Sequence, residues 1–330
     1  MEKINRVIIF TEGGDNIGFG HITRCSALYE ELVGRDIETI FVVYGNNINE
    51  ILEGKEYINT DWKNIEFLKD FLKKDDYIII DSYLANLKIY NFISNNTKKC
   101  MYIDDNNRIK YPKGVILNPV LYEDLEYETT NPILRGKDYI IIRKEFLEDI
   151  QPLKKEIDIL ITLGGTDIRN LTPKLIKILQ EIDSTFNIAI VIGKAFNNKK
   201  EIEALKTDKI SLFYNISAME MRDFILKSKF VICGCGQSIN EMLILRANFL
   251  PILIADNQVR NYNFLVKKKI VNCAMNYKEL SYIKNIIKKF LEEESNIGFN
   301  FLKNSNQNKR IIDFFIGDQL WKVKINFKKI

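Results

Sequence analysis

Histidine is almost absent from this sequence: His21 is the single one among 330 residues. Zinc sites built on two or three imidazoles and hydrolases of the HExxH type are therefore excluded. Any imidazole chemistry in this protein would have to use His21. The five cysteines are an odd number in a chain of this length. We therefore expect a reducing compartment rather than a disulfide scaffold.

Proline and glycine are also scarce, with 6 and 16 residues, while 46% of the residues are hydrophobic and 28% are charged. This composition excludes collagen-like, low-complexity and disordered chains. Lys and Arg (48) only slightly outnumber Asp and Glu (44), so we do not expect nucleic acid as a partner. No apolar run is long enough to span a bilayer, and the first residues do not resemble a signal peptide. We expect a soluble, cytoplasmic protein; its oligomeric state does not follow from the sequence.

Short β-branched runs alternate with longer helical stretches, which predicts an α/β protein with parallel sheets. The length predicts two domains. The strands that we expect lie at 6–11, 39–43, 77–81, 99–104, 137–142, 157–163, 188–192, 210–214, 230–233 and 250–255. Helices are expected at about 21–33, 62–73 and 277–294, among others.

The charged segment 143–156, which contains Pro152, separates two such alternating blocks. We therefore expect Rossmann-like domains at 1–150 and 151–297, facing a cleft in which ligands of such folds usually bind. The remainder, 298–330, is expected to form a helix near 310–315 and a strand-like tail. In that tail, apolar residues alternate with polar ones at Trp321, Val323, Ile325 and Phe327.

A Gly-rich turn follows the first expected strand and contains Gly18 and Gly20 just before His21. Backbone amides at the start of a helix suit an anion. The dinucleotide fingerprint is not complete here, because Thr23 stands where its last glycine would be. The positive helix end disfavours an imidazolium, so we expect His21 to accept a proton. The alternative is that His21 only caps the helix or packs in the turn; the glycines favour a function.

A second Gly-rich turn, Gly164, Gly165 and Thr166 followed by Asp167, comes after the first strand of the second half. Paired glycines allow a close approach to the backbone, and the two polar residues offer contacts at a carboxyl end of a strand.

A third turn contains Gly236 and leads to Ser238 and Glu241. Two interpretations are equally supported. Ser238 and Glu241 have the spacing of a capping box, in which the glutamate folds back on the N-cap amide. Alternatively, the amides near Ser238 hold a diphosphate while Glu241 accepts hydrogen bonds from ribose hydroxyls. The Cys233 and Cys235 pair lacks the further ligands of a zinc site, so we interpret it as structural.

Two acidic positions follow expected strands. Asp81 ends an apolar strand, so its carboxylate should open toward the cleft. The run 104–107, Asp-Asp-Asn-Asn, has the composition of a solvated turn. We predict no metal site.

Six short motifs together resemble a known family. They are GFGHxxRC at 18–25, IDSY at 80–83, IDDNNR at 103–108, GGTD at 164–167, SxxE at 238–241 and DNQ at 256–258. In this order the sequence is similar, over about residues 6–315, to the UDP-sugar hydrolases of pseudaminic-acid biosynthesis and their spore-coat polysaccharide relatives. The resemblance implies two domains of the GT-B glycosyltransferase fold. It also implies cleavage of UDP-2,4-diacetamido-2,4,6-trideoxy-β-L-altropyranose by water, without a metal or cofactor.

The resemblance also implies roles for single residues. It makes His21 the group that activates water, with Tyr83 as its catalytic neighbour. The nucleotide-binding residues that follow from it are Gly164, Gly165, Thr166, Gly236, Ser238 and Glu241. The sugar-binding residues that follow from it are Gly18, Gly20, Asp81, Asn257 and Gln258. Ser82 departs from the pseudaminic-acid enzymes, which usually have His there, and matches the spore-coat branch; the exact sugar therefore stays open.

Our leading hypothesis is a hydrolase that inverts the anomeric centre and releases UDP and a free amino-deoxy sugar for nonulosonic-acid synthesis. One alternative is a GT-B glycosyltransferase, in which an acceptor hydroxyl replaces water. Another alternative is a nucleotide-sugar binding protein without catalysis.

Overall fold

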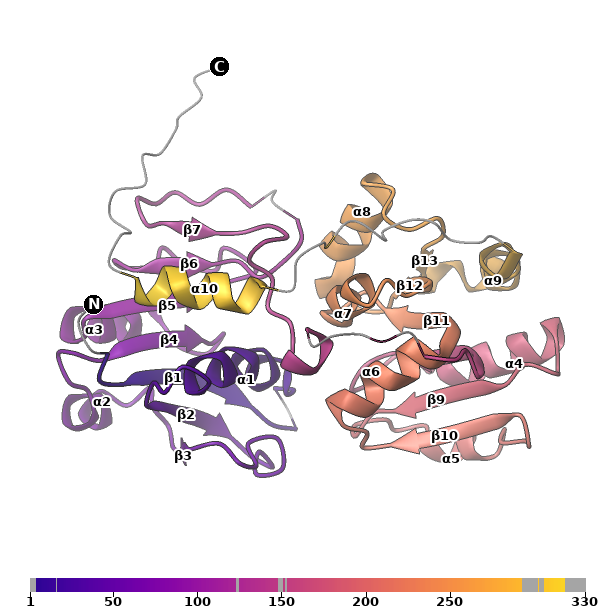
Figure 1. The fold of residues 1–330 in the computed structure, drawn as a ribbon, viewed down its shortest axis with the longest axis horizontal. Coiled ribbons are helices and arrows are strands. Elements are labelled where there is room, and N and C mark those ends of the chain that lie inside the picture. The colour runs from indigo at the N-terminus through magenta and orange to yellow at the C-terminus, as the bar shows by residue number, and fades with distance from the viewer. Residues whose placement is uncertain are drawn as a thin grey trace, which may run out of the picture. The chain divides into compact units, whose positions relative to one another are not determined.

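The computed structural model describes residues 4–15, 17–122, 125–147, 151, 153–292, 302 and 306–317. The chain forms two compact units, each an α/β unit (Figure 1). The first consists of Met1–Pro119, Glu123–Ile141 and Asn306–Ile330, and the second of Val120–Tyr122 and Ile142–Ser305.

The first unit contains a seven-stranded parallel sheet with the strand order β3-β2-β1-β4-β5-β6-β7. Its central strands β1 and β4 are buried along their whole length, as parallel strands covered on both faces must be. The strands are β1 (Val7–Gly13), β2 (Thr39–Gly45), β3 (Tyr57–Asn59), β4 (Tyr77–Asp81), β5 (Lys99–Ile103), β6 (Val115–Leu117) and β7 (Ile133–Leu134).

Successive residues of β1 point to opposite faces of this sheet and enter two separate cores. Val7 and Ile9 pack with α1 (Gly20–Val33) and α10 (Gln307–Ile316), which share one core. Ile8 and Phe10 pack with Trp62 and residues of α2 (Ile65–Phe71) and α3 (Leu87–Asn96) on the other face.

The second unit contains a six-stranded parallel sheet with the order β10-β9-β8-β11-β12-β13. Its strands are β8 (Ile157–Thr162), β9 (Ile188–Ile192), β10 (Ile210–Tyr214), β11 (Ser228–Gly234), β12 (Phe249–Leu253) and β13 (Met275–Asn276). Its helices are α4 (Thr172–Ile182), α5 (Lys199–Glu203), α6 (Ala218–Lys227), α7 (Ser238–Ile244), α8 (Val259–Lys267) and α9 (Ile283–Glu292). Short 3₁₀ turns lie at η1 (Lys144–Phe146), η2 (Asp256–Gln258) and η3 (Tyr277–Tyr282).

Each sheet has one place where the chain changes direction across the sheet. In the first unit β1 lies between β2 and β4, and in the second β8 lies between β9 and β11. Ligands of open α/β sheets bind beyond the carboxyl ends of the strands at such a switch point. A binding site is therefore expected beyond the carboxyl ends of β1 and β4 in the first unit, and of β8 and β11 in the second.

The α/β class is confirmed, and most expected strands occur with ends that differ by a few residues. The strand expected at 137–142 is wrong. Ile140 and Ile141 are buried without joining the sheet, and the edge is instead formed by the short strands β6 and β7. The helix expected at 62–73 begins only at Ile65, because the Asn64 side chain caps it by accepting a hydrogen bond from the Glu66 amide.

The helix α10 belongs to the first unit, although it follows the whole second unit in the sequence. Figure 1 shows it in yellow near α1, and Ile311, Ile312 and Phe315 are completely buried in the core shared with α1. The units divide between Ile141 and Ile142, whereas the sequence predicted a boundary at 150 and a separate segment 298–330. The strand-like tail with Trp321, Val323, Ile325 and Phe327 lies outside the described residues.

None of the helices in the described ranges is both long enough and apolar enough to cross a membrane.

Replacing Phe315 should show that α10 is part of the first unit's core. Phe315 has no exposed surface and its ring meets the Tyr77 ring edge-on at 5.7 Å. Phe315→Ala should lower the stability of this unit by about 3–5 kcal/mol, because it leaves a cavity. Native-state hydrogen exchange of amides in β1 and β4 measures this loss. Lys309→Ala, exposed on the same helix, should change it by no more than about 0.5 kcal/mol. Equal effects of the two variants would contradict this packing.

Candidate functional site

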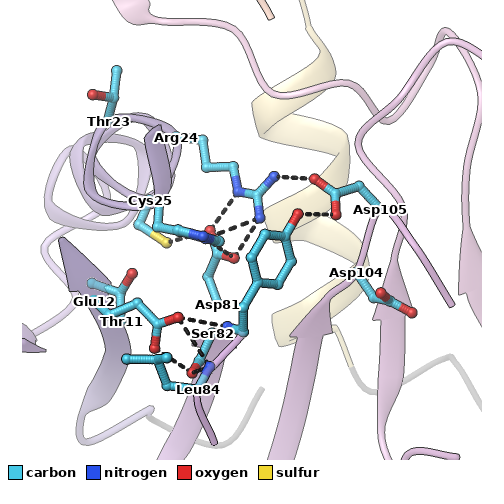
Figure 2. Close-up of polar contacts among 12 residues, drawn as sticks. Thr11, Glu12, Thr23, Arg24, Cys25, Asp81, Ser82, Leu84, Asp104 and Asp105 are labelled. Carbon is cyan, nitrogen blue, oxygen red and sulfur yellow. Dashed lines mark hydrogen bonds and ion pairs between the residues drawn. The ribbon is translucent and has the colours of Figure 1, made fainter. Parts of the chain in front are cut away.

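The residues singled out in the first half meet at the carboxyl ends of β1, β4 and β5. His21 is the second residue of α1, and Asp81 is the last residue of β4. The Nδ1 atom of His21 lies 2.7 Å from Oδ1 of Asp81. Asp81 is completely buried, and Figure 2 shows the hydrogen bonds that converge on its carboxylate.

The charge of Asp81 decides which nitrogen of His21 carries the hydrogen. Burial alone would raise the pKa of Asp81, but the charge of Arg24 and the hydrogen bonds from Arg24 and His21 lower it below its usual range. An ionised carboxylate can only accept hydrogen bonds, so Nδ1 must be the donor. With Nδ1 as the donor, a neutral His21 imidazole carries its lone pair on Nε2, the nitrogen that could accept a proton.

Arg24 clamps the same carboxylate from one turn further along α1. Its Nε lies 2.5 Å from Oδ2 of Asp81 and its Nη2 lies 2.5 Å from Oδ1, which is a bidentate contact. Its Nη1 donates to Oδ2 of Asp105 at 2.8 Å. The Arg24 side chain is only 4% exposed, so one guanidinium connects two carboxylates away from water.

Tyr83 lies against His21 and is tied to the same network. The two rings meet edge to face with centroids 4.6 Å apart, and the phenol donates to Oδ1 of Asp105 at 2.5 Å. Burial and the Asp105 carboxylate raise the pKa of Tyr83, so it stays a phenol near neutral pH. Its side chain is 43% exposed and can therefore reach a ligand.

Glu12 and Asp105 belong to this edge, and the sequence analysis did not select them. Glu12 is completely buried and accepts hydrogen bonds from the Ser82 hydroxyl, the Tyr83 amide and the Leu84 amide. The sequence did contain a signal for Glu12, which is a lone carboxylate at the end of an apolar strand.

The interpretation of 104–107 as a solvated turn is wrong at its start, because Asp104 is 1% exposed. Burial raises the pKa of Asp104.

The Gly-rich turn before α1 is closed on itself by backbone hydrogen bonds. The Gly14 amide donates to the Gly18 carbonyl, and the Gly18 amide donates to the Gly14 carbonyl. Gly18 has φ +84°, a conformation that favours glycine, whereas Gly20 is the first residue of α1. Among the described atoms, none lies within 4 Å of the place where a Cβ on Gly20 would stand.

In the second unit, Gly164, Gly165 and Thr166 are exposed and follow β8 directly. Gly164 has φ +98°, which explains the glycine at this position. Asp167, expected to offer polar contacts, accepts hydrogen bonds from the Leu171 and Thr172 amides instead. It therefore anchors the start of α4.

The turn after β11 carries Gly236, Ser238 and Glu241, and the capping-box interpretation is wrong. Helix α7 begins at Ser238, Gln237 occupies the N-cap position, and no side chain caps it. Glu241 instead accepts two hydrogen bonds from Arg143, at 2.7 Å from Nε and 3.0 Å from Nη2. Burial raises the pKa of Glu241, and the charge of Arg143 opposes this shift. The sequence analysis placed Arg143 in a linker and missed it.

Asn257 and Gln258 lie in η2, just after β12. Gln258 accepts a hydrogen bond from the Ile254 amide, and its Nε2 lies 3.6 Å from where a Cβ on Gly236 would stand. Asn257 is exposed. The residues selected in the second half thus follow three neighbouring strands, β8, β11 and β12, at the carboxyl edge of one sheet.

Metal-binding side chains do not gather within the described ranges: no three His, Cys, Asp or Glu residues there could together hold an ion. Cys233 and Cys235 are buried free thiols, and burial raises the pKa of each.

No protein-family model matches the chain. An uncharacterized protein of Methanocaldococcus jannaschii is 28% identical over 290 residues, which cover 80% of this chain and 58% of that protein. The UDP-2,4-diacetamido-2,4,6-trideoxy-beta-L-altropyranose hydrolase of Campylobacter jejuni is 27% identical, over 80% of this chain and 97% of its own length. The spore coat polysaccharide biosynthesis protein SpsG of Bacillus subtilis is 26% identical, over 59% of this chain and 61% of its own. The chain thus spans less than two thirds of the M. jannaschii and B. subtilis relatives.

Solved structures show the fold. MurG of Acinetobacter baumannii superposes with a TM-score of 0.64 at 13% identity, covering 94% of this chain and 99% of that one. The UDP-GlcNAc 2-epimerase of M. jannaschii superposes with a TM-score of 0.58 at 15% identity, covering 93% and 98%. The expected GT-B fold class and the resemblance to the pseudaminic-acid UDP-sugar hydrolases and their spore-coat relatives are therefore confirmed.

Proposed function

We propose that this protein is a nucleotide-sugar hydrolase that cleaves the anomeric C–O bond of a UDP-linked amino-deoxy sugar with water. The observation that carries the proposal is the His21–Asp81 pair, in which Nδ1 lies 2.7 Å from a buried carboxylate, so that we assign the role of base to Nε2. The similarity to the C. jejuni hydrolase suggests the substrate class, a 2,4-diacetamido-2,4,6-trideoxyhexose. Ser82 leaves the exact sugar open.

The reaction that we propose uses His21 as a general base. The oxygen of water attacks the anomeric carbon while Nε2 takes a proton from it, and the bonding electrons of the C–O bond leave with UDP. Attack from the side opposite the leaving group inverts the anomeric centre. The Asp81 carboxylate holds the imidazole in one tautomer and stabilises the imidazolium that forms. Tyr83, which stays protonated, contacts the His21 ring and can hold the water or a sugar substituent.

Binding of the substrate is assigned to the turns at the carboxyl edges of the sheets. We assign the diphosphate to backbone amides at Gly164, Gly165, Thr166, Gly236 and Ser238. We assign the ribose to Glu241, whose side chain is 13% exposed and whose oxygens can each accept a further hydrogen bond beside those from Arg143. Gly18, Gly20, Asn257 and Gln258 are assigned to the sugar. Asp81 was expected to contact the sugar too, but both of its oxygens are buried and occupied by His21 and Arg24. We therefore assign it to the orientation of His21.

His21→Asn tests the base. The Asn amide can still donate to Asp81 from near the position of Nδ1, but it cannot take a proton, so kcat should fall by about 10²–10⁴-fold with a modest change in KM. Turnover of the UDP-sugar in ¹⁸O-water should place the label in the sugar and none in UDP. Tyr83→Phe, which keeps the ring beside His21 and removes only the phenol oxygen, should lose less activity than His21→Asn because the base stays in place.

Three outcomes would contradict this proposal. Label in UDP would show attack at phosphorus rather than carbon. UDP release that requires an added sugar acceptor would identify a glycosyltransferase instead. Intact UDP binding without any turnover would identify a binding protein.

Glu241 and its partner Arg143 should control the affinity for UDP. Glu241→Ala should weaken UDP binding by about 1–3 kcal/mol, because ribose hydroxyls lose their acceptor. Burial already raises the pKa of Glu241, so Arg143→Met, which removes the opposing charge, should let Glu241 take up a proton as the pH falls. UDP affinity of Arg143→Met should therefore fall more steeply with decreasing pH than that of the wild type, by calorimetry. Lys144→Ala, exposed in the same turn, is the control. Unchanged affinity in Glu241→Ala would remove this residue from the site.

Hydrolysis should continue at its full rate in excess EDTA. We expect this because backbone amides, rather than a metal ion, are assigned to the leaving diphosphate. Assays of UDP release with and without EDTA measure it. A loss of activity that magnesium or manganese restores would overturn the assignment.

A further inference from the structure

Arg24 is unusual because one buried guanidinium holds both the carboxylate behind the proposed base and the carboxylate that binds Tyr83. Its fork occupies both oxygens of Asp81 at 2.5 Å, and its remaining contact goes to Asp105 at 2.8 Å. Its Nη2 also lies 3.2 Å from Nδ1 of His21. Because Nδ1 already donates to Asp81, this short distance brings two donors together and is repulsive when the imidazole is charged.

The charges around His21 come from four strands or helices. Helix α1 contributes Arg24 and the neutral thiol of Cys25. The other groups lie at the carboxyl ends of the strands. They are Asp81 at the end of β4, Tyr83 after it, Asp105 after β5 and Glu12 in β1. Glu12 is occupied by the Ser82 hydroxyl and two amides. Arg24 is thus the cation that contacts both Asp81 and His21 among the described residues.

Without Arg24, the pair of His21 and Asp81 would not make a good base. A buried carboxylate in contact with an imidazole strongly favours the charged imidazolium, because charges interact strongly where water is excluded. A base that is already protonated cannot accept the proton of water. The carboxylate would then orient the imidazole and disable it at the same time. A cation on the other side of the carboxylate removes this conflict.

We propose that Arg24 is a positioning residue that lets Asp81 fix the orientation of His21 without holding it protonated. The guanidinium compensates the carboxylate charge and repels an imidazolium, while the hydrogen bond from Nδ1 to Asp81 is kept. This inference rests on the proposed function, in which His21 accepts a proton. Through Asp105, the same side chain also fixes the phenol of Tyr83 beside the imidazole.

The sole histidine makes the protonation state directly observable. In full-length protein without a histidine tag, a long-range ¹H–¹⁵N spectrum shows His21 alone. The spectrum of the wild type gives the reference pH dependence and shows which of the two nitrogens carries a proton. In Arg24→Gln we expect both nitrogens to stay protonated to a pH about one unit higher, the size of shift that a neighbouring charge produces. This measurement needs no substrate, so its result stands whether or not the protein hydrolyses a UDP-sugar.

Kinetics give the second readout. The acid limb of kcat/KM against pH should move upward by about one pH unit in Arg24→Gln, and Arg24→Lys, which keeps the charge, should return it toward the wild-type position. Asp105→Asn covers the case in which Arg24→Gln does not fold, because Asp105 is partly exposed. Asp105→Asn removes the second carboxylate that Arg24 neutralises, so the guanidinium compensates Asp81 more completely. The imidazole should then lose its proton at a lower pH than in the wild type.

The results that would overturn the proposal are equally specific. They are an imidazole spectrum of folded Arg24→Gln that follows the wild-type pH dependence, or a shift of Asp105→Asn in the same direction as that expected for Arg24→Gln. A loss of activity in Arg24→Gln with an unchanged pH profile would also count against it, since a merely structural role produces that pattern.

Discussion

The negative charge of Asp81, held with no access to water, is the constraint around which the first unit's site is built. An isolated buried carboxylate is very costly, so it persists only with hydrogen-bond donors and a cation against it. His21 and Arg24 supply these from α1, where residues three apart share a face. The first turn of α1, which begins at Gly20, thus lies against the end of β4 at Asp81.

Much of the fold could be predicted from the sequence because buried parallel strands require continuous β-branched runs, as in β1 and β4. The misassignments have physical causes. β6 and β7 are too short to produce a recognisable run, whereas 140–142 is apolar because Ile140 and Ile141 are buried without joining the sheet. Trp62 fits a helical spacing but precedes α2, since its indole donates to the Thr11 carbonyl. The spacing of apolar residues alone cannot distinguish such buried loop residues from residues of helices and strands.

For the site, His21 and Tyr83 could be selected because a glycine turn and a strand end precede them, and because they match the motifs of a family. Arg24 lies in the GFGHxxRC motif and Glu12 ends an apolar strand, but the partners of Arg24, and those of Arg143, could not be assigned in this way. Arg24 pairs with Asp105 81 positions away, and Arg143 pairs with Glu241 98 positions away. A pairing over such a distance depends on which strands lie side by side. At Glu241 a local pattern was misleading. The residue has the spacing of a capping box, but its carboxylate accepts hydrogen bonds from an arginine far away in the sequence.

The position of α10 in the sequence also determines the order in which the two units can complete their folding during synthesis. The second unit ends before this helix, so its strands leave the exit tunnel together and can assemble while synthesis continues. The first unit, although its strands come first, lacks Ile311, Ile312 and Phe315 until the last part of the chain appears. The apolar face of α1 that α10 covers stays open to water or to a chaperone throughout that interval. The half that is translated first is therefore the half that is completed last.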